Sequence, residues 1–433
     1  MSGSGGARVG RPAPLRLVAC YFTAALACWL AAAATLAAAA PDLAHAGFAA
    51  ADVLLAVHLV ALGFLPLAVA GAALHVLPTL LRNDASALRG WAALPLLCAG
   101  PALAVGVARG LDALIWPTAA AETLGFVLVA WELVALVLRA PRGRLLLASR
   151  AGILLSTLHA AAALAVGAGL AARGWRPLLG VPHERAIAIH LHLAVLGWLT
   201  LLIVVVGRTL GPMLALAPAA GRRRAPVEEL ALTAGLWLLL GGFALDVTAL
   251  ELSGAGLALG AVAAFAVLMS RVARQHRLAG LEGPLTHLVT GLFFLGQAAV
   301  LGIGMLLGLG ASPRRLTAYV VSLLVGWAAG VTLGHLGKLL SLSAWTWWPP
   351  GPRPKQAGLY PRRLWLAEAI AFGLGVEAAV DGALAGSTGL VRLGAVLLLG
   401  SAVAAAAAAA WTLRRGLPAL DLLSSKALLP RVS

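Results

Sequence analysis

The sequence predicts an all-α, polytopic membrane protein: one integral membrane domain over residues 1–433 with about twelve transmembrane helices. Two observations lead to this prediction. Hydrophobic residues make up 61% of the chain and charged residues only 11%, which is too little charge to cover the surface of a soluble protein of this length. In addition, the apolar residues gather in runs long enough to cross the hydrocarbon core of a bilayer, separated by short arginine-rich segments.

Each expected span is an apolar run of about 20 residues or more. The first run continues for about 26 residues, longer than the core of a signal peptide, so we expect it to stay in the membrane. The expected spans are 15–40, 51–81, 90–109, 118–138, 150–172, 186–210, 228–250, 254–274, 285–309, 316–343, 364–385 and 389–413.

The basic residues predict the orientation of these spans. Loops on the N-terminal side of the membrane carry 23 Lys and Arg residues, and the opposite loops carry 7. Because basic loops stay in the cytoplasm, we expect both termini there, in the cytoplasmic (inner) membrane of a bacterium. A formal net charge of +16 would suggest nucleic acid as the partner of a soluble protein. Here the loops account for that charge, so we expect a lipid bilayer and no nucleic acid as the partner.

An internal repeat relates three of the expected spans. The pattern His-Leu-x-x-Leu-Gly starts at His58 and again at His192, and prolines near the inner ends of both spans keep the same offset of 134 residues. Span 316–343 keeps Gly326 at an offset of 129 residues from Gly197. These offsets predict three units of four spans each, in a pseudo-threefold arrangement.

Six histidines at membrane depth are the candidate cofactor-binding residues. Polar groups are costly inside a bilayer, and a neutral imidazole binds haem iron or a metal ion there without adding charge. The candidates are His58, His190 and His192 toward the outer side and His75, His335 and His287 toward the inner side.

Helix geometry limits how these histidines can combine. His190 and His192 point about 200° apart on one helix, so at most one of them can bind a given metal ion. We favour His192 because it is the repeat equivalent of His58. The expected pairs are His58 with His192 and His75 with His335; the alternative is that these rings only form hydrogen bonds between helices or cap carbonyl groups.

Intramembrane carboxylates form a second constellation. Glu122 and Glu132 lie on span four, and Glu377 and Asp381 share one face of span eleven at the i, i+4 spacing. We expect these four carboxylates to form a proton path. Further carboxylates are Asp246 and Glu251, expected at the outer end of span seven, and Glu368. The alternative is pairing with the basic residues Arg208, Lys338 or Arg392.

The segments His190–Trp198 and Gly334–Lys338, together with the three-unit architecture, resemble subunit I of the haem–copper oxidase superfamily. The closest similarity is to the divergent small oxidase-like and NnrS-like membrane proteins. This resemblance implies a b-type haem with His58 as a ligand, copper bound by His192 or His190, and a cytochrome or quinol as electron donor.

The chain also departs from the oxidase pattern. Span 228–250 lacks a histidine pair, and Val321 stands at the span-ten position equivalent to His58. No tyrosine lies in span six. The standard three-histidine copper site is therefore incomplete, which leaves both copper binding and an oxidoreductase activity open and assigns no catalytic residue.

The expected function is haem binding, with copper as an open addition, in electron transfer or in the handling of nitric oxide or oxygen. Two alternatives use the same residues differently. The chain is then either a proton-coupled or metal transporter, or a non-catalytic subunit of a respiratory membrane complex.

Overall fold

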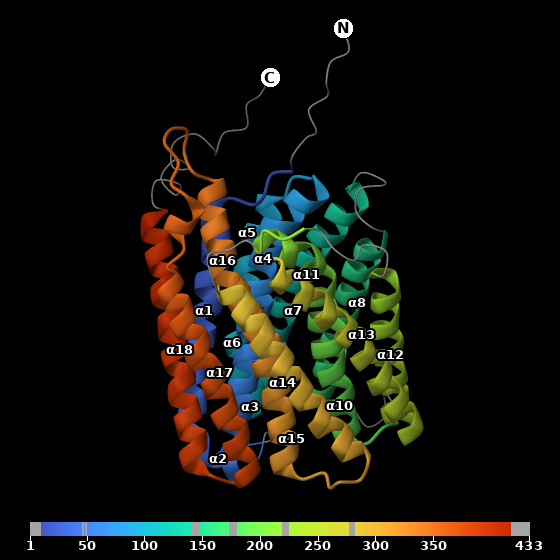
Figure 1. Cartoon of the computed structure of the whole chain (residues 1–433). Helices are drawn as coiled ribbons and strands as arrows, with labels where there is room; N and C mark the ends of the chain where they lie inside the picture. The colour runs from blue at the N-terminus through green and yellow to red at the C-terminus, as the bar shows by residue number, and fades with distance from the viewer. Residues whose placement is uncertain are drawn as a thin grey trace.

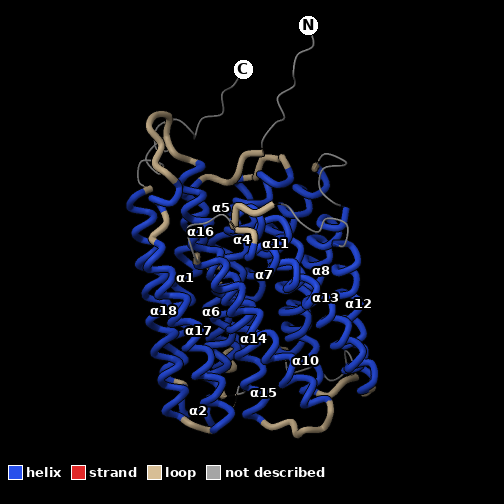
Figure 2. The backbone as a smooth tube through the Cα atoms, viewed as in Figure 1, coloured by secondary structure: helices blue, strands red, loops and turns tan. Residues whose placement is uncertain are grey.

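The computed structural model describes residues 10–45, 47, 50–140, 147–172, 180–218, 225–276 and 282–416. Within these ranges the chain forms helices joined by loops and contains no strand, which confirms the predicted all-α class. The helices lie roughly parallel in one bundle (Figures 1 and 2), with the loops at its two ends.

We divide the described helices into three groups in chain order. The first group is α1 (Leu15–Ala38), α2 (Ala40–His45), α3 (Ala51–His58), η1 (Leu59–Phe64), α4 (Leu65–Leu81), α5 (Ala87–Leu97), α6 (Gly100–Arg109) and α7 (Asp112–Arg139). The second group is α8 (Leu147–Ala171), α10 (His183–His192), η2 (Leu193–Thr200), α11 (Leu201–Leu214), α12 (Ala225–Leu245) and α13 (Thr248–Arg274). The third group is α14 (Gly283–Leu306), α15 (Pro313–Val320), η3 (Val321–Ala329), α16 (Gly330–Thr346), η4 (Gln356–Leu359), α17 (Arg362–Ala385) and α18 (Thr388–Arg415).

Eleven helical segments among the described residues are long and apolar enough to cross a bilayer, so the chain is a multi-pass membrane protein. The remaining expected span corresponds to α17, which fails this criterion because it carries the carboxylates Glu368, Glu377 and Asp381. Large apolar side chains such as those of Trp131 and Val300 are exposed on the outside of the bundle, as a lipid environment requires.

Three segments of the bundle are π-helical, and they occupy matching places in the three groups. The segments η1, η2 and η3 each form the middle of a long membrane helix, and each contains a glycine of the repeat predicted from the sequence. A π-helix bonds residue i to residue i+5 and is rare outside short segments, which are frequent at functional sites. Three of them at repeat-equivalent positions are a structural feature that the sequence pattern alone did not predict.

The repeat glycines of these segments touch the first helix of their own group. An added Cβ atom would lie within 3 Å of a Cβ atom on α1, α8 or α14, so only glycine allows the helices to approach so closely. The contacts are Gly63 with Cys28, Gly197 with His159, and Gly326 with Phe294.

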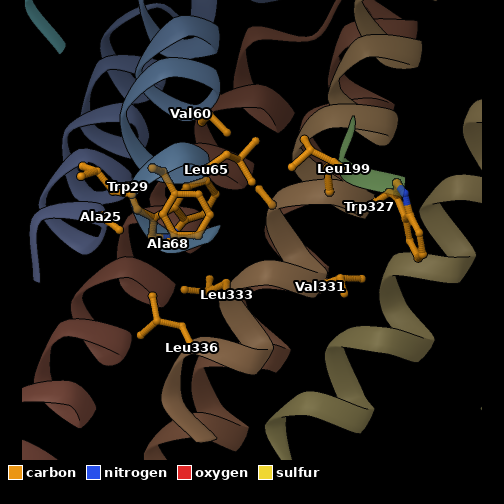
Figure 3. Close-up of a cluster of buried hydrophobic side chains, with 14 of the residues drawn as sticks. Ala25, Trp29, Val60, Leu65, Ala68, Leu199, Trp327, Val331, Leu333 and Leu336 are labelled. Carbon is orange, nitrogen blue, oxygen red and sulfur yellow. The ribbon is translucent and has the colours of Figure 1, made fainter. Parts of the chain in front are cut away.

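The π segments also pack against each other at the centre of the bundle. Trp327 on η3 is fully buried and donates its indole N–H to the hydroxyl oxygen of Thr200 on η2 at 2.8 Å. Figure 3 shows Trp327 beside Leu199, with Leu65 and Val60 from the first group in the same apolar cluster. The second and third groups are therefore joined at their π segments.

Both ends of the described chain lie on one face of the bundle (Figure 1). Trp347, just after α16, donates its indole N–H to the carbonyl oxygen of Ala13 before α1, and Gly416 after α18 lies against Ala344. The expected topology, with both termini on one side of the membrane, requires the two ends of the chain to lie on the same face. The cytoplasmic orientation of this face stays a prediction, because it rests in part on Arg142, Arg144, Arg222, Arg223 and Arg224, which lie outside the described residues.

The boundary between spans seven and eight differs from the prediction. Helix α12 ends at Leu245, and Asp246 follows with a left-handed backbone (φ 59°) and an ion pair to Arg185. Glu251 lies in the first turn of α13. Asp246 and Glu251 are therefore turn and helix-start residues and not part of span seven; the apolar run hid a tight turn of two residues.

We predict that Gly326→Ala destabilises the protein by about 1–3 kcal/mol, because its new methyl group would overlap the ring and Cβ atom of Phe294. The matched control is Gly296→Ala on α14, where no atom lies within 4 Å of the added Cβ position. Thermal unfolding of the purified protein in detergent measures both changes. Equal melting temperatures for the two variants would contradict the tight packing of η3.

Candidate functional site

Four of the predicted histidines hold their rings in the same way. In each, the Nδ1 atom lies 2.7–2.9 Å from a backbone carbonyl oxygen. A neutral imidazole carries one N–H, so donating from Nδ1 leaves the lone pair on Nε2 free to accept a hydrogen bond or bind a metal. The pairs are His58 with Leu54, His192 with Ala188 and His335 with Val331, each one turn earlier on the same helix, and His190 with Ala163 on α8.

Two of these histidines come from different groups of helices, His58 from the first and His190 from the second. His58 at the end of α3 and His190 on α10 lie close enough to interact electrostatically. Gly167 on α8 makes room for the His190 ring, since a Cβ atom there would lie 2.8 Å from Cε1. The pairing of His58 with His192 stays a prediction, and His190 is a second candidate partner for His58.

His192 faces a different partner, as its angular separation from His190 requires. Its Nε2 atom lies 2.7 Å from the hydroxyl oxygen of Tyr319 on α15, and both side chains are buried. With Nδ1 committed to Ala188, the Tyr319 O–H is the donor and Nε2 is the acceptor. Phe243 on α12 packs against the same imidazole, with ring centroids 5.1 Å apart.

Sequence reasoning missed Tyr319 because it looked for a tyrosine only on span six. A signal was available: Tyr319 stands two residues before Val321, the position in the third repeat that corresponds to His58 and His192. The third repeat therefore has a tyrosine near the level where the other two have histidines.

A cavity of about 200 Å³ opens at His192, between the second and third groups. Its walls come from α10, α12, α13, α14 and α15, and they are almost entirely apolar. Many of the lining residues are small, among them Ala188, Ala258, Ala298 and Gly302. His192 and Tyr319 supply the polar atoms that border it.

The inner histidines His75 and His335 have different surroundings. His335 on α16 lies within electrostatic range of His287 on α14. His75 on α4 is buried, and its Nδ1 atom has no hydrogen-bond partner among the described residues. No hydrogen bond joins His75 and His335 in the described part of the chain, and their pairing through a bound cofactor stays a prediction.

His287 belongs to a buried hydrogen-bonded group that spans three helices. Its Nε2 atom lies 2.8 Å from Oε2 of Glu368 on α17, and both side chains are completely buried. Ser401 on α18 donates its hydroxyl to Oε1 of the same carboxylate at 2.9 Å. Gly334 on α16 lets the backbone approach His287, because an added Cβ atom would lie 2.4 Å from that of His287.

The four carboxylates predicted as a proton path have separate surroundings. Glu132 binds the Arg89 side chain at 2.6 Å and accepts from the backbone N–H of Ser86 at the start of α5. Glu122 is buried, and its Oε2 atom has no hydrogen-bond partner in the described ranges.

The two candidates on α17 also differ. Glu377 accepts hydrogen bonds from Gln297, which in turn accepts from Ser322 on η3 at 2.8 Å. Asp381 is exposed one turn further along the helix.

Two of the three basic residues expected as carboxylate partners, Arg208 and Lys338, pair with other carboxylates. Arg208 forms an ion pair with Glu228, and Lys338 binds Glu282 at 2.6 Å. Lys338 also lies over the ring of Tyr360, 4.9 Å from its centroid. Tyr360 lies in the loop outside the spans, and burial raises the pKa of its hydroxyl. The hydroxyl therefore stays protonated and accepts from the backbone N–H of Gly283.

No three His, Cys, Asp or Glu side chains gather as a metal site within the ranges that the structure describes. A comparison of the chain with protein-family models and with curated proteins finds no match. Haem and copper binding therefore remain predictions, and the geometry of the histidines is their support.

We predict that Glu368→Ala lowers stability by about 1–3 kcal/mol, because it leaves the buried ring nitrogen of His287 and the hydroxyl of Ser401 without a partner. Asp381→Ala removes the same type of charge from an exposed position of the same helix and serves as the control. The stability of both variants is measured by heating the protein in detergent and following the loss of its monodisperse peak in size-exclusion chromatography. An equal, small effect of the two variants would show that the buried group contributes no stability.

Proposed function

We propose that this chain is a haem-binding protein of the bacterial inner membrane, with the twelve-span, pseudo-threefold architecture of haem–copper oxidase subunit I. Three observations support the architecture. The π segments recur at repeat-equivalent positions, the same glycine contacts recur in each group, and α17 lies in the bundle beside α18. The proposed haem site is the cavity at His192.

The observation that carries this proposal is the His192 imidazole at the wall of an apolar cavity. Its tautomer is set by Ala188, so the atom that meets Tyr319 and the cavity is a neutral nitrogen with a lone pair. Histidines that ligate metals usually donate their other ring N–H to a carbonyl group in this way.

The residues of the cavity fit a haem. A single neutral imidazole among apolar side chains would suit the iron ligand of a mostly apolar group such as a haem. When bound, the haem iron supplies one-electron chemistry and a position for a diatomic ligand such as nitric oxide or oxygen. Iron at Nε2 would take the lone pair that now accepts from Tyr319, so haem binding would release the Tyr319 O–H as a donor beside the site, while Phe243 packs against the imidazole.

His58 and His190 supply a second donor set with two free Nε2 atoms. These two imidazoles would hold a haem that supplies electron transfer. A cytochrome or quinol is the electron donor that this proposal implies. Copper is left out of it, since it would need ligands that the described residues do not bring together.

The test is the visible spectrum of the purified protein, read as a haem assay in pyridine and as a carbon monoxide difference spectrum. We expect near-stoichiometric b-type haem, and His192→Ala should lower the carbon monoxide signal at least about tenfold by removing the axial ligand. His58→Ala should remove a low-spin signal and leave the carbon monoxide signal unchanged.

The control is His183→Ala, an exposed histidine at the start of the same helix. It should change neither signal. A protein without haem after expression in haem-supplemented cells would overturn the proposal, and so would a carbon monoxide spectrum that survives the loss of His192.

A proton-coupled transporter is the second candidate function, and the buried group of His287, Glu368 and Ser401 favours it. A carboxylate sealed between three helices and bonded to an imidazole is a place where a proton can be held inside the membrane. In this function the histidines carry protons and bind no iron.

We predict for the transporter that vesicles containing the protein and a trapped pH-sensitive dye acidify when a proton gradient is applied, and that Glu368→Gln abolishes the flux. The exposed Asp381→Asn is the matched control and should leave it unchanged. Haem-free protein with Glu368-dependent flux would favour the transporter over the haem protein; absence of flux in haem-loaded protein would exclude it.

A further inference from the structure

A second cavity, of about 120 Å³, lies where the three long repeat helices meet. Its walls come from α4, α11 and α16, with Ala72, Val206 and Val331 as examples from each. Phe22, Phe265 and Leu288 close it from neighbouring helices. This central cavity is separate from the one at His192, because the two have no lining residue in common.

Two polar side chains of α16 border this otherwise apolar space, one turn apart. Thr332 donates its hydroxyl to the carbonyl oxygen of Ala328 at 2.8 Å, and His335 donates Nδ1–H to that of Val331. Each side chain has thereby used its only hydrogen on its own helix. The Thr332 oxygen and the His335 Nε2 lone pair remain as acceptors, and both residues line the cavity.

Acceptors in an apolar cavity without a donor favour a ligand that brings a hydrogen-bond donor. A cavity of this size with purely apolar walls takes small apolar molecules, and water enters only where it finds several polar partners. An apolar ligand with an O–H group satisfies an acceptor that would otherwise stay unpaired.

We infer that the central cavity binds a small aromatic alcohol, with its ring against the apolar walls and its hydroxyl hydrogen on His335 or Thr332. A phenol has one such group and a quinol head group has two, which matches the two acceptors one turn apart. The inference concerns a different site from the proposed haem site and holds whether or not haem binds.

A smaller cavity adjoins this site. It shares Gly211, Met269, Leu288 and His335 with the central cavity and extends to Glu282. Glu282 binds Lys338 near the end of the helices. His335 thus lines both cavities, and neither of them shares a lining residue with the cavity at His192.

The test uses 19F NMR on the purified protein in lipid nanodiscs, with 4-fluorophenol, 2-fluorohydroquinone and 4-fluorotoluene as probes. The first and last have nearly the same shape and differ in the hydroxyl group. We expect 4-fluorophenol to bind about 3- to 10-fold more tightly than 4-fluorotoluene, the effect of one hydrogen bond. A further gain for 2-fluorohydroquinone identifies a quinol ligand, and no gain identifies a phenol.

Four variants complete the test. Ala72→Leu fills the cavity and should weaken all three probes. Thr332→Val and His335→Phe should each reduce the preference for the hydroxylated probes. The matched control is Thr346→Val, an exposed position of α16 with the same hydrogen bond to the carbonyl four residues earlier, and it should change nothing. Equal affinity for 4-fluorophenol and 4-fluorotoluene, or binding that Ala72→Leu does not weaken, would overturn the inference.

Discussion

Inside a bilayer every polar hydrogen of the protein must find its acceptor within the protein, because lipid offers none. The backbone meets this demand with helices. The imidazole rings also use backbone carbonyl groups as acceptors. His58, His192 and His335 each donate Nδ1–H to the carbonyl group one turn earlier. That single bond decides the tautomer, and the tautomer decides that Nε2 is the atom offered to a partner. The chemistry proposed for both cavities depends on it.

The π segments connect the placement of these histidines with the packing of the whole bundle. They begin directly after His58 and His192, and in the third group directly after Val320, so the helix widens at the same level each time. The glycines in them bring the first helix of each group close enough for His159 to bond the carbonyl oxygen of Gly197 at 3.1 Å. Packing at the centre of the bundle and the placement of the histidines are thus parts of one arrangement.

Most of the fold could be predicted from the sequence, because hydrophobic length sets where a membrane helix begins and ends. Span 51–81 coincides with α3, η1 and α4, and span 364–385 differs from α17 by two residues at its start. The turn after Leu245 was misplaced because no polar run marks it. The π segments were not predicted, since the repeat pattern shows related helices but not how their hydrogen bonds shift.

The candidate site could be predicted only in part. Depth in the membrane grouped His58 with His192, whereas the structure gives His192 a hydrogen bond from Tyr319 and places His190 within electrostatic range of His58. The helical angle between His190 and His192 correctly required different partners. Which partner each one meets depends on how separate groups of helices pack, and a single sequence does not contain that information in any local pattern.

An electron cryo-microscopy map of the purified protein in nanodiscs would test the central claim most directly. The account predicts flat density in the cavity between α10, α13 and α14, continuous with Nε2 of His192, and three widened helical turns at η1, η2 and η3. A cavity filled by lipid or side chains, with His192 still bonded to Tyr319 in protein prepared with haem supplied, would contradict it.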